Sequence, residues 1–265
     1  MGKRKYAIGV FDSGLGGLTV VKELIKQLPN EDIVYFGDTA RVPYGTKSKE
    51  AIMRFSKENV RFLLKHKVKM IVVACNSSSS FALSALHEKF SLPIVGVIEP
   101  GAKKACAVTK NKKIGVIATF ATIQSQKYVR MIKKISKKAI VKSQACPLFV
   151  PLAEEGWFFE KATRDIAKKY LSTMIKSKID TLILGCTHYP LLKKVIASVM
   201  GRQVFLVDSA KETAGEVKGI LKKMDLENLS SRKGRYQFFV SDKPQHFKDL
   251  AKRFLGCNIK NIKKV

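Results

Sequence analysis

Two segments, Ile71-Val72-Val73-Ala74-Cys75-Asn76-Ser77 and Leu182-Ile183-Leu184-Gly185-Cys186-Thr187-His188, follow the same pattern. In each, an apolar run typical of a buried β-strand ends in a small residue, a cysteine and side chains that can bind an anion. Because ligands of parallel sheets bind at the carboxyl ends of strands, both thiols are expected at such an edge. Two thiols placed in this way suggest two acid/base groups that face one small substrate and transfer protons at both faces of one carbon.

A second pair of similar segments supports an internal duplication. Ile8-Gly9-Val10-Phe11 recurs as Ile114-Gly115-Val116-Ile117 after 106 positions, and Cys75 recurs as Cys186 after 111 positions. An internal repeat should leave more than one such match at nearly equal offsets. Short apolar strands that end in glycine or cysteine look alike in any α/β protein, but two pairs in register favour two similar half-domains.

Apolar runs and helical patterns alternate along the chain. Strands are expected at 7–11, 33–36, 70–74, 94–97, 114–118, 139–143, 181–185, 203–207 and 237–240. Helices expected between them include 18–27, 49–65, 78–89, 120–134, 161–176, 191–200 and 210–223. Continuous apolar strands that alternate with helices are typical of parallel sheets covered on both faces, so the predicted fold class is α/β.

Length and cysteine content place the chain among ordinary globular proteins. Its 265 residues can form one large or two modest domains, and 46% of them are apolar. No apolar run approaches the roughly 20 residues of a membrane span, and the short run 6–11 is expected to start a strand and not a signal peptide. The cysteines are odd in number, widely spaced and without a Cys-x-x-Cys pair, so neither a disulfide framework nor a structural zinc site is expected. They are Cys75, Cys106, Cys146, Cys186 and Cys257, and reduced thiols in a cytoplasm are the default.

The charge balance is unusual, because 50 Lys and Arg against 21 Asp and Glu give a net charge of +29. Such a charge attracts nucleic acid, anionic membrane surfaces and acidic small molecules. The lysines, however, are spread over helix faces and turns, and no zinc-finger spacing or aromatic RNA-binding signature accompanies them. A solvated surface is therefore favoured over a dedicated nucleic-acid site, which stays open as the alternative.

The glycine-rich loop Asp12-Ser13-Gly14-Leu15-Gly16-Gly17-Leu18-Thr19 precedes an expected helix. Its backbone amides can bind a carboxylate or a phosphate. Its spacing matches neither Gly-x-Gly-x-x-Gly nor a P-loop, and Asp12 would repel a phosphate. An amino acid fits better, because its ammonium can pair with Asp12 while its carboxylates bind the amides. A tight strand-to-helix turn capped by Asp12 is the alternative.

Several long motifs in this order resemble those of glutamate racemases, and the match extends from about residue 6 to the C-terminus. Aspartate racemases share the paired cysteines but not the segment Arg41-Val42-Pro43-Tyr44-Gly45. The motifs are Phe11-Asp12-Ser13-Gly14-Leu15-Gly16-Gly17, Gly37-Asp38-Thr39-Ala40-Arg41-Val42-Pro43-Tyr44-Gly45, Ala74-Cys75-Asn76, Gly96-Val97-Ile98-Glu99-Pro100-Gly101 and Leu184-Gly185-Cys186-Thr187-His188-Tyr189-Pro190-Leu191-Leu192.

The resemblance implies an enzyme without cofactor or metal that interconverts L- and D-glutamate and supplies D-glutamate for peptidoglycan. By similarity, Cys75 would act on D-glutamate with help from Asp12. Cys186 would act on L-glutamate with help from His188 and a glutamate of segment 151–156; Glu154 is favoured and Glu155 is the alternative. Neighbours of this kind are needed because a free cysteine, with a pKa of about 8.5, is only a few per cent thiolate at pH 7.

The resemblance also assigns the substrate contacts, which include Asp12 and His188. Ser13, Tyr44 and Gly45 would hold the side-chain carboxylate, and Asn76, Ser77 and Thr187 would hold the α-carboxylate. Neutral donors suit a reaction that builds negative charge at Cα, because they stabilise the charge without protonating it. Ser77 departs from the family, which usually has threonine and alanine early in this run; serine keeps the hydroxyl but loses the methyl that fixes the rotamer.

The implied architecture is two similar α/β lobes related by a pseudo-two-fold duplication, each a mostly parallel sheet flanked by helices. The first lobe, 1–98 plus 209–265, would carry Asp12 and Cys75, and the second, 99–208, would carry Glu154 and Cys186, with the active site between them. A cytoplasmic homodimer with no membrane contact is expected. The alternative is a two-lobed binding protein whose cysteines only pack; such a protein would not exchange the α-hydrogen of glutamate with solvent.

Overall fold

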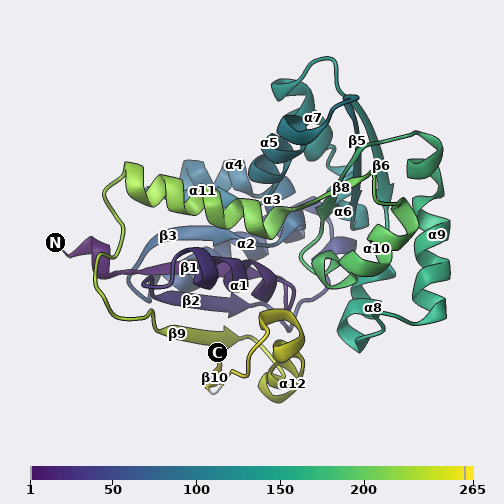
Figure 1. The fold of residues 1–265 in the computed structure, drawn as a ribbon. Helices are drawn as coiled ribbons and strands as arrows, with labels where there is room; N and C mark the ends of the chain where they lie inside the picture. Colours follow the sequence, from purple (N-terminus) through teal and green to yellow (C-terminus); the bar gives the residue numbers. More distant parts are fainter. Residues whose placement is uncertain (1, 260) are drawn as a thin grey trace.

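The computed structural model describes residues 2–259 and 261–265 and contains two parallel sheets (Figure 1). The first has the order β10-β9-β2-β1-β3-β4 and the second β6-β5-β7-β8. We call each sheet with its helices the first and the second lobe. The strands are Ala7–Asp12 (β1), Ile33–Gly37 (β2), Val68–Val73 (β3), Ile94–Gly96 (β4), Lys113–Ala118 (β5), Ile140–Ala145 (β6), Thr181–Gly185 (β7), Phe205–Asp208 (β8), Tyr236–Val240 (β9) and Ile262–Lys264 (β10).

Twelve α-helices connect these strands within the described residues. They are Leu18–Gln27 (α1), Lys49–Leu64 (α2), Asn76–Phe81 (α3), Leu83–Lys89 (α4), Ile98–Val108 (α5), Phe120–Gln124 (α6), Lys127–Ile135 (α7), Phe149–Glu155 (α8), Lys161–Lys176 (α9), Lys193–Met200 (α10), Ser209–Lys223 (α11) and Pro244–Leu255 (α12). Short 3₁₀ turns are Lys3–Lys5 (η1), Tyr44–Thr46 (η2) and Tyr189–Leu192 (η3). None of the helices described here is long and apolar enough to cross a membrane.

Strand order reproduces the duplication expected from the sequence. The orders β2-β1-β3-β4 and β6-β5-β7-β8 are the same when β1 is matched with β5 and β3 with β7. The two repeated apolar segments therefore lie on the two central strands of each matched four-strand unit, which pair in parallel. The predicted α/β class with two similar lobes is confirmed, and β9 and β10 extend the first lobe only.

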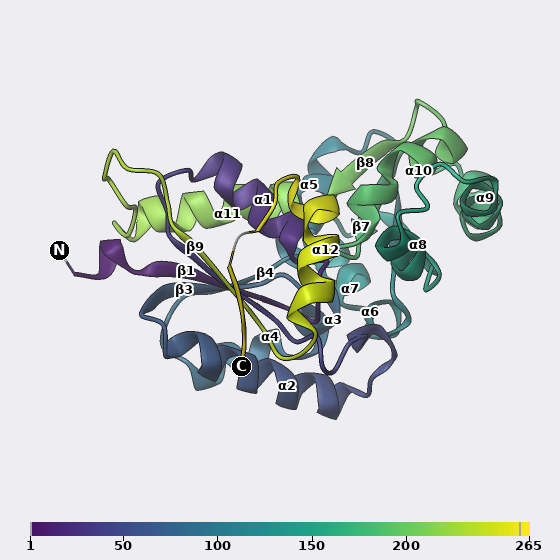
Figure 2. The same cartoon turned by 90° about the horizontal axis from the view of Figure 1, so that it is seen from below.

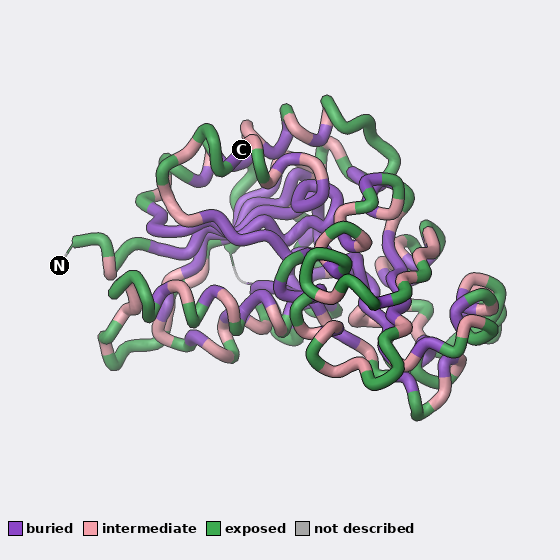
Figure 3. Tube along the Cα trace, turned by 90° about the horizontal axis from the view of Figure 1, so that it is seen from above, coloured by how far each residue is buried: buried purple, intermediate pink, exposed green. Residues whose placement is uncertain are grey.

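Alternate residues of the central strands face two separate cores, which is why these strands are apolar throughout. On β1, Ile8 and Val10 pack with α1, α11 and α12, whereas Phe11 packs with α2 and α4. Since successive side chains of a strand point to opposite faces, a sheet covered on both sides needs an unbroken apolar run. Figure 2 shows the helices on both sides of this sheet, and Figure 3 shows the buried strands between them.

Two predicted helices are each divided in the structure. The helix expected at 78–89 begins at Asn76 and breaks at Ala82, between α3 and α4. In its serine-rich part, Ser79 and Ser80 donate to backbone carbonyls, and such bonds compete with regular helix. The helix expected at 120–134 breaks at Gln126, whose φ of 54° is left-handed. Helices α1 and α9 and strand β7 have the predicted bounds, whereas α8, α12 and β10 were not predicted.

Candidate active site

The two cysteines lie at equivalent strand ends. Cys75 follows β3 and precedes α3, and Cys186 follows β7 and precedes η3. Both are buried, with 5% and 7% of their surface exposed. Asp12, the last residue of β1, is completely buried at the neighbouring strand end of the first lobe. Each sheet thus carries one buried thiol at the end of a strand, at the position where the repeated sequence pattern predicts it.

The Cys75 thiol has a carboxylate and a hydroxyl as its neighbours. It donates a weak hydrogen bond to Ser13 Oγ at 3.9 Å. Burial, followed by the negative charge of Asp12, raises the pKa of Cys75 to about 12, so this sulfur carries a proton at neutral pH. Asp12 accepts one bond from Gly14 N at 3.1 Å, and its buried Oδ1 has no partner among the residues described. Burial raises the pKa of Asp12 as well, although the positive charge of His188 opposes this.

The Cys186 thiol faces a histidine that is held by a carboxylate. Its sulfur lies 3.8 Å from Nδ1 of His188, whose Nε2 lies 2.9 Å from Oε1 of Glu154. Burial alone lowers the pKa of His188, but hydrogen bonds to Cys186 and Glu154 outweigh it and raise the pKa to about 10. The imidazole is therefore protonated at neutral pH. An imidazolium in this place can stabilise negative charge on the sulfur and can return a proton to it.

Glu154, and not Glu155, contacts His188; Glu155 is exposed. The position of Glu154 depends on α12 of the first lobe, because Arg253 donates a hydrogen bond to its backbone carbonyl. The neighbouring Phe254 packs edge-on against the His188 ring, with centroids 5.3 Å apart. This support could not be predicted from the sequence, since no motif connects α12 with the histidine.

Hydroxyl groups from both lobes gather around the start of α3. Ser77 Oγ lies 3.3 Å from Thr119 Oγ1 and 3.4 Å from Thr122 Oγ1 of the second lobe. Asn76 Oδ1 accepts a hydrogen bond from Tyr128 of the second lobe at 2.8 Å. The three second-lobe residues were missed by sequence reasoning. The internal repeat could have identified Thr119, because Thr119 follows β5 in the same way as Ser13 follows β1.

Tyr44 and Gly45 lie on η2, against the second lobe. A Cβ added to Gly45 would come within 2.8 Å of Thr119 Cβ, so the chain passes close to the threonine cluster. The Tyr44 hydroxyl points elsewhere, because it donates to Asp38 and accepts from Asn59 Nδ2 at 3.1 Å. Burial and Asp38 raise the pKa of Tyr44. Any substrate contact at Tyr44 therefore involves its backbone N–H and not its hydroxyl.

Thr187 and His188 touch the glycine-rich loop of the first lobe. Thr19 Oγ1 donates to the Thr187 carbonyl at 3.0 Å. A Cβ added to Gly16 would overlap Thr187 Oγ1 and come within 2.6 Å of the His188 ring. The loops that follow β1 and β7 are thus in direct contact, and only a glycine fits at this point.

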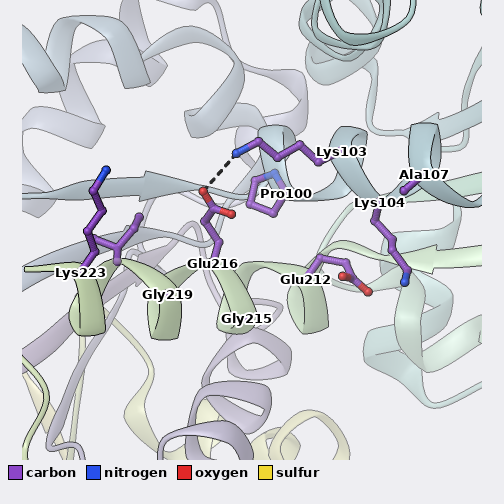
Figure 4. Close-up of a pocket in the computed structure, with 10 residues that line it drawn as sticks. Pro100, Lys103, Lys104, Ala107, Glu212, Gly215, Glu216, Gly219 and Lys223 are labelled. Atoms are coloured by element: carbon purple, nitrogen blue, oxygen red, sulfur yellow. Dashed lines mark hydrogen bonds and ion pairs between the residues drawn. The ribbon is translucent and has the colours of Figure 1, made fainter.

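Two of the surface pockets show where solvent lies relative to the candidate residues. The larger, with a volume of about 610 Å³, lies between α5 and α11 and is lined by Lys103, Lys104, Lys223, Glu212 and Glu216, among others (Figure 4). It contains none of the candidate residues. A pocket of about 340 Å³ is lined by Gly14, Val42 and Glu154 and borders the site. In the part of the chain that the structure describes, no group of three or more His, Cys, Asp and Glu could hold a metal ion.

Comparisons with known proteins show which family this chain is similar to. The family model for Asp/Glu/hydantoin racemase matches residues 8–217. A glutamate racemase of Geobacter metallireducens is 52% identical over 259 residues, which are 98% of this chain and 96% of the relative. The crystal structure of a glutamate racemase isoform from Bacillus anthracis is similar, with a TM-score of 0.95 and 41% identity, covering 99% of this chain and 98% of that one. The Francisella tularensis glutamate racemase in complex with D-glutamate has a TM-score of 0.93 and 39% identity, with the same coverage.

Proposed function

Because the chain belongs to the Asp/Glu/hydantoin racemase family and is an isomerase of glutamate, we propose that Cys75 and Cys186 are the two bases of the reaction. The observation that carries this proposal is the placement of one buried thiol at the end of β3 and the other at the end of β7. Each thiol has its own ionisable neighbour, Asp12 for Cys75 and His188 for Cys186. Proton transfer at the two faces of Cα needs such a pair.

In the proposed mechanism, the thiolate of Cys186 removes the α-proton of L-glutamate, forming an S–H bond while the electron pair stays at Cα. The Cys75 thiol then donates its proton to the opposite face, which gives D-glutamate and a Cys75 thiolate. The reverse reaction starts at Cys75. Burial favours the protonated form of Cys75, which suits its role as the proton donor in the L-to-D direction, and the protonated imidazole of His188 lies beside the Cys186 sulfur. Asp12 and His188 help to reset the sulfur protonation after each turnover.

We propose that neutral donors hold the two carboxylates of glutamate. Asn76, Ser77 and Thr187 would bind the α-carboxylate, and the contact of Ser77 with Thr119 and Thr122 adds two hydroxyls to this part of the site. Ser13 and the backbone N–H groups of Tyr44 and Gly45 would bind the side-chain carboxylate. The substrate ammonium would pair with Asp12, whose buried Oδ1 lacks a partner among the described residues. A charged group at such a site must be paired when it leaves water.

We further propose that residues 1–98 plus 209–265 form the first lobe and residues 99–208 the second. The chain is proposed to be a cytoplasmic homodimer. Its D-glutamate is proposed to serve peptidoglycan synthesis. The two separate sheets support the lobe bounds. Resemblance to the family supports the role in peptidoglycan. Free thiols at both catalytic positions suit a reducing compartment. The exposed side chains of Phe120, Trp157 and Phe159 supply apolar surface for a dimer contact.

Purified protein should racemise L- and D-glutamate without pyridoxal phosphate or metal, because two thiols alone can carry the proton transfers. Circular dichroism measures the reaction, with aspartate as the comparison substrate, and deuterium incorporation at Cα reports proton exchange. Full activity is expected after chelation, and turnover of aspartate should be at most about 1% of that of glutamate, since its carboxylates lie closer together. Activity lost on chelation and restored by zinc would contradict the mechanism. Binding of glutamate without exchange of its α-hydrogen would instead indicate a binding protein.

DNA binding should be weak and should disappear near physiological salt. Residues 100–153 contain 12 Lys and Arg and no Asp or Glu, so this segment is the strongest candidate for non-specific contact with phosphates. Binding that depends on counterion release falls steeply with salt, by roughly 10³-fold or more between 50 and 200 mM for six or more contacts. Fluorescence anisotropy of a labelled duplex measures it, and the variant Lys133→Glu/Lys137→Glu should weaken it further. Tight, sequence-selective binding at 150 mM salt would show a dedicated nucleic-acid function.

A further inference from the structure

Tyr128 is a second-lobe residue whose hydroxyl contacts the first lobe. It lies on α7 with 2% of its surface exposed, and its ring packs in the second-lobe core. A Cβ added to Gly185 would come within 3.1 Å of the ring, and one added to Gly101 within 3.6 Å. These glycines let the tyrosine extend past the end of β7 and the start of α5 toward the other lobe.

Two buried side chains hold the Tyr128 hydroxyl. It donates to Asn76 Oδ1 at 2.8 Å and lies 3.1 Å from Ser209 Oγ. Ser209 is the first residue of α11, where the chain returns from the second lobe to the first. Burial raises the pKa of Tyr128, so the hydroxyl keeps its proton and remains a donor throughout the pH range of the reaction.

The bond from Tyr128 determines which way the Asn76 amide faces. An asparagine side chain has one acceptor oxygen and one NH₂ group, so an oxygen held by Tyr128 turns the NH₂ away from α7. In residues 2–259 and 261–265, Nδ2 of Asn76 makes no hydrogen bond, and it is not among the fully buried unpaired atoms. This donor is therefore available to a carboxylate in the cleft.

We propose that Tyr128 is a positioning residue that orients the Asn76 amide so that its NH₂ group binds the substrate α-carboxylate. This inference rests on the proposed function, because it takes the α-carboxylate to lie at Asn76. Tyr128 and Asn76 belong to different lobes, so their bond links the two lobes at the proposed carboxylate site.

The variant Tyr128→Phe removes the hydroxyl and keeps the ring. Its KM for both enantiomers should rise about tenfold, as for the loss of one hydrogen bond, while kcat changes by less than about threefold. If Tyr128 acts through Asn76, the substitution should have no further effect on KM in an Asn76→Ala background, since coupled residues are not additive. Tyr170→Phe is the matched control: it removes a second-lobe tyrosine hydroxyl whose one hydrogen bond among the described residues is accepted from the Leu148 N–H, and KM should not change.

Two results would overturn the inference: an unchanged KM in Tyr128→Phe, or an equal rise of KM in the Asn76→Ala background. If Tyr128→Phe does not fold, the variant Asn76→Asp tests whether the NH₂ group of Asn76 binds the carboxylate. Aspartate keeps the acceptor for Tyr128 but replaces the NH₂ donor with a carboxylate oxygen. A KM raised about 100-fold or more is expected for Asn76→Asp, and a KM near that of the original protein would overturn the inference. Failure of the unmodified protein to racemise glutamate would instead refute the proposed function.

Discussion

Replacing either Cys75 or Cys186 with serine should lower glutamate racemisation by roughly 10⁴-fold or more in both directions. In the proposed mechanism, each turnover needs one sulfur to take a proton and the other to give one, and a serine hydroxyl is far too weak an acid to replace either. The two thiols lie at the ends of separate sheets, so neither can substitute for the other. Circular dichroism with each enantiomer measures the loss.

Half-reactions should distinguish the two thiols. An analogue of glutamate with a good β-leaving group needs only proton abstraction for elimination, so one working base is enough. Cys75→Ser should retain elimination from the L-analogue, using Cys186, and Cys186→Ser should retain it from the D-analogue, using Cys75. Serine at Cys106 or Cys257, neither of which is a candidate base, should leave turnover unchanged. Racemisation near the original rate in either active-site variant would refute the two-base assignment.

The strand ends that carry Cys75 and Cys186 could be predicted from the sequence. The apolar pattern of a strand and the residues that follow it can both be recognised within a short stretch of the chain. An unbroken apolar run ending in Cys75 or Cys186 implies a buried parallel strand, and the topology of such sheets places its end at the ligand edge. The same argument places Asp12. His188 could be predicted as well, since it lies two residues from its cysteine and shares its turn.

The remaining contacts of the site depend on tertiary packing, which leaves no local pattern. Tyr128 and Arg253 reach the site from helices whose sequences show only ordinary amphipathic spacing. Nothing in the sequence near Tyr44 indicates that its hydroxyl is held by Asp38. Glu154 and Glu155 are equivalent by sequence, and only the turn of α8 directs one to His188 and the other to solvent.

Gly16→Ala should lower kcat/KM by roughly 100-fold or more while leaving most of the thermal stability intact. The added methyl would overlap Thr187 Oγ1 and press on the His188 ring at the contact between the lobes. Opening the lobes relieves this overlap without unfolding either sheet. A displacement of about 1 Å at a reacting centre costs on the order of 100-fold in rate, and opening also exposes the site to water.

Kinetics and thermal melting together test this expectation, with Gly219→Ala as the matched control. Gly219 lies on α11, and a Cβ there would meet nothing within 4 Å, so alanine should leave kcat/KM unchanged and stabilise the helix by about 1 kcal/mol. A large fall in melting temperature for Gly16→Ala would mean that the overlap strains the fold instead of opening the cleft. Unchanged kcat/KM in that variant would mean that catalysis does not need the contact of the glycine-rich loop with Thr187 and His188, and hence that the working site is more open than the one described here.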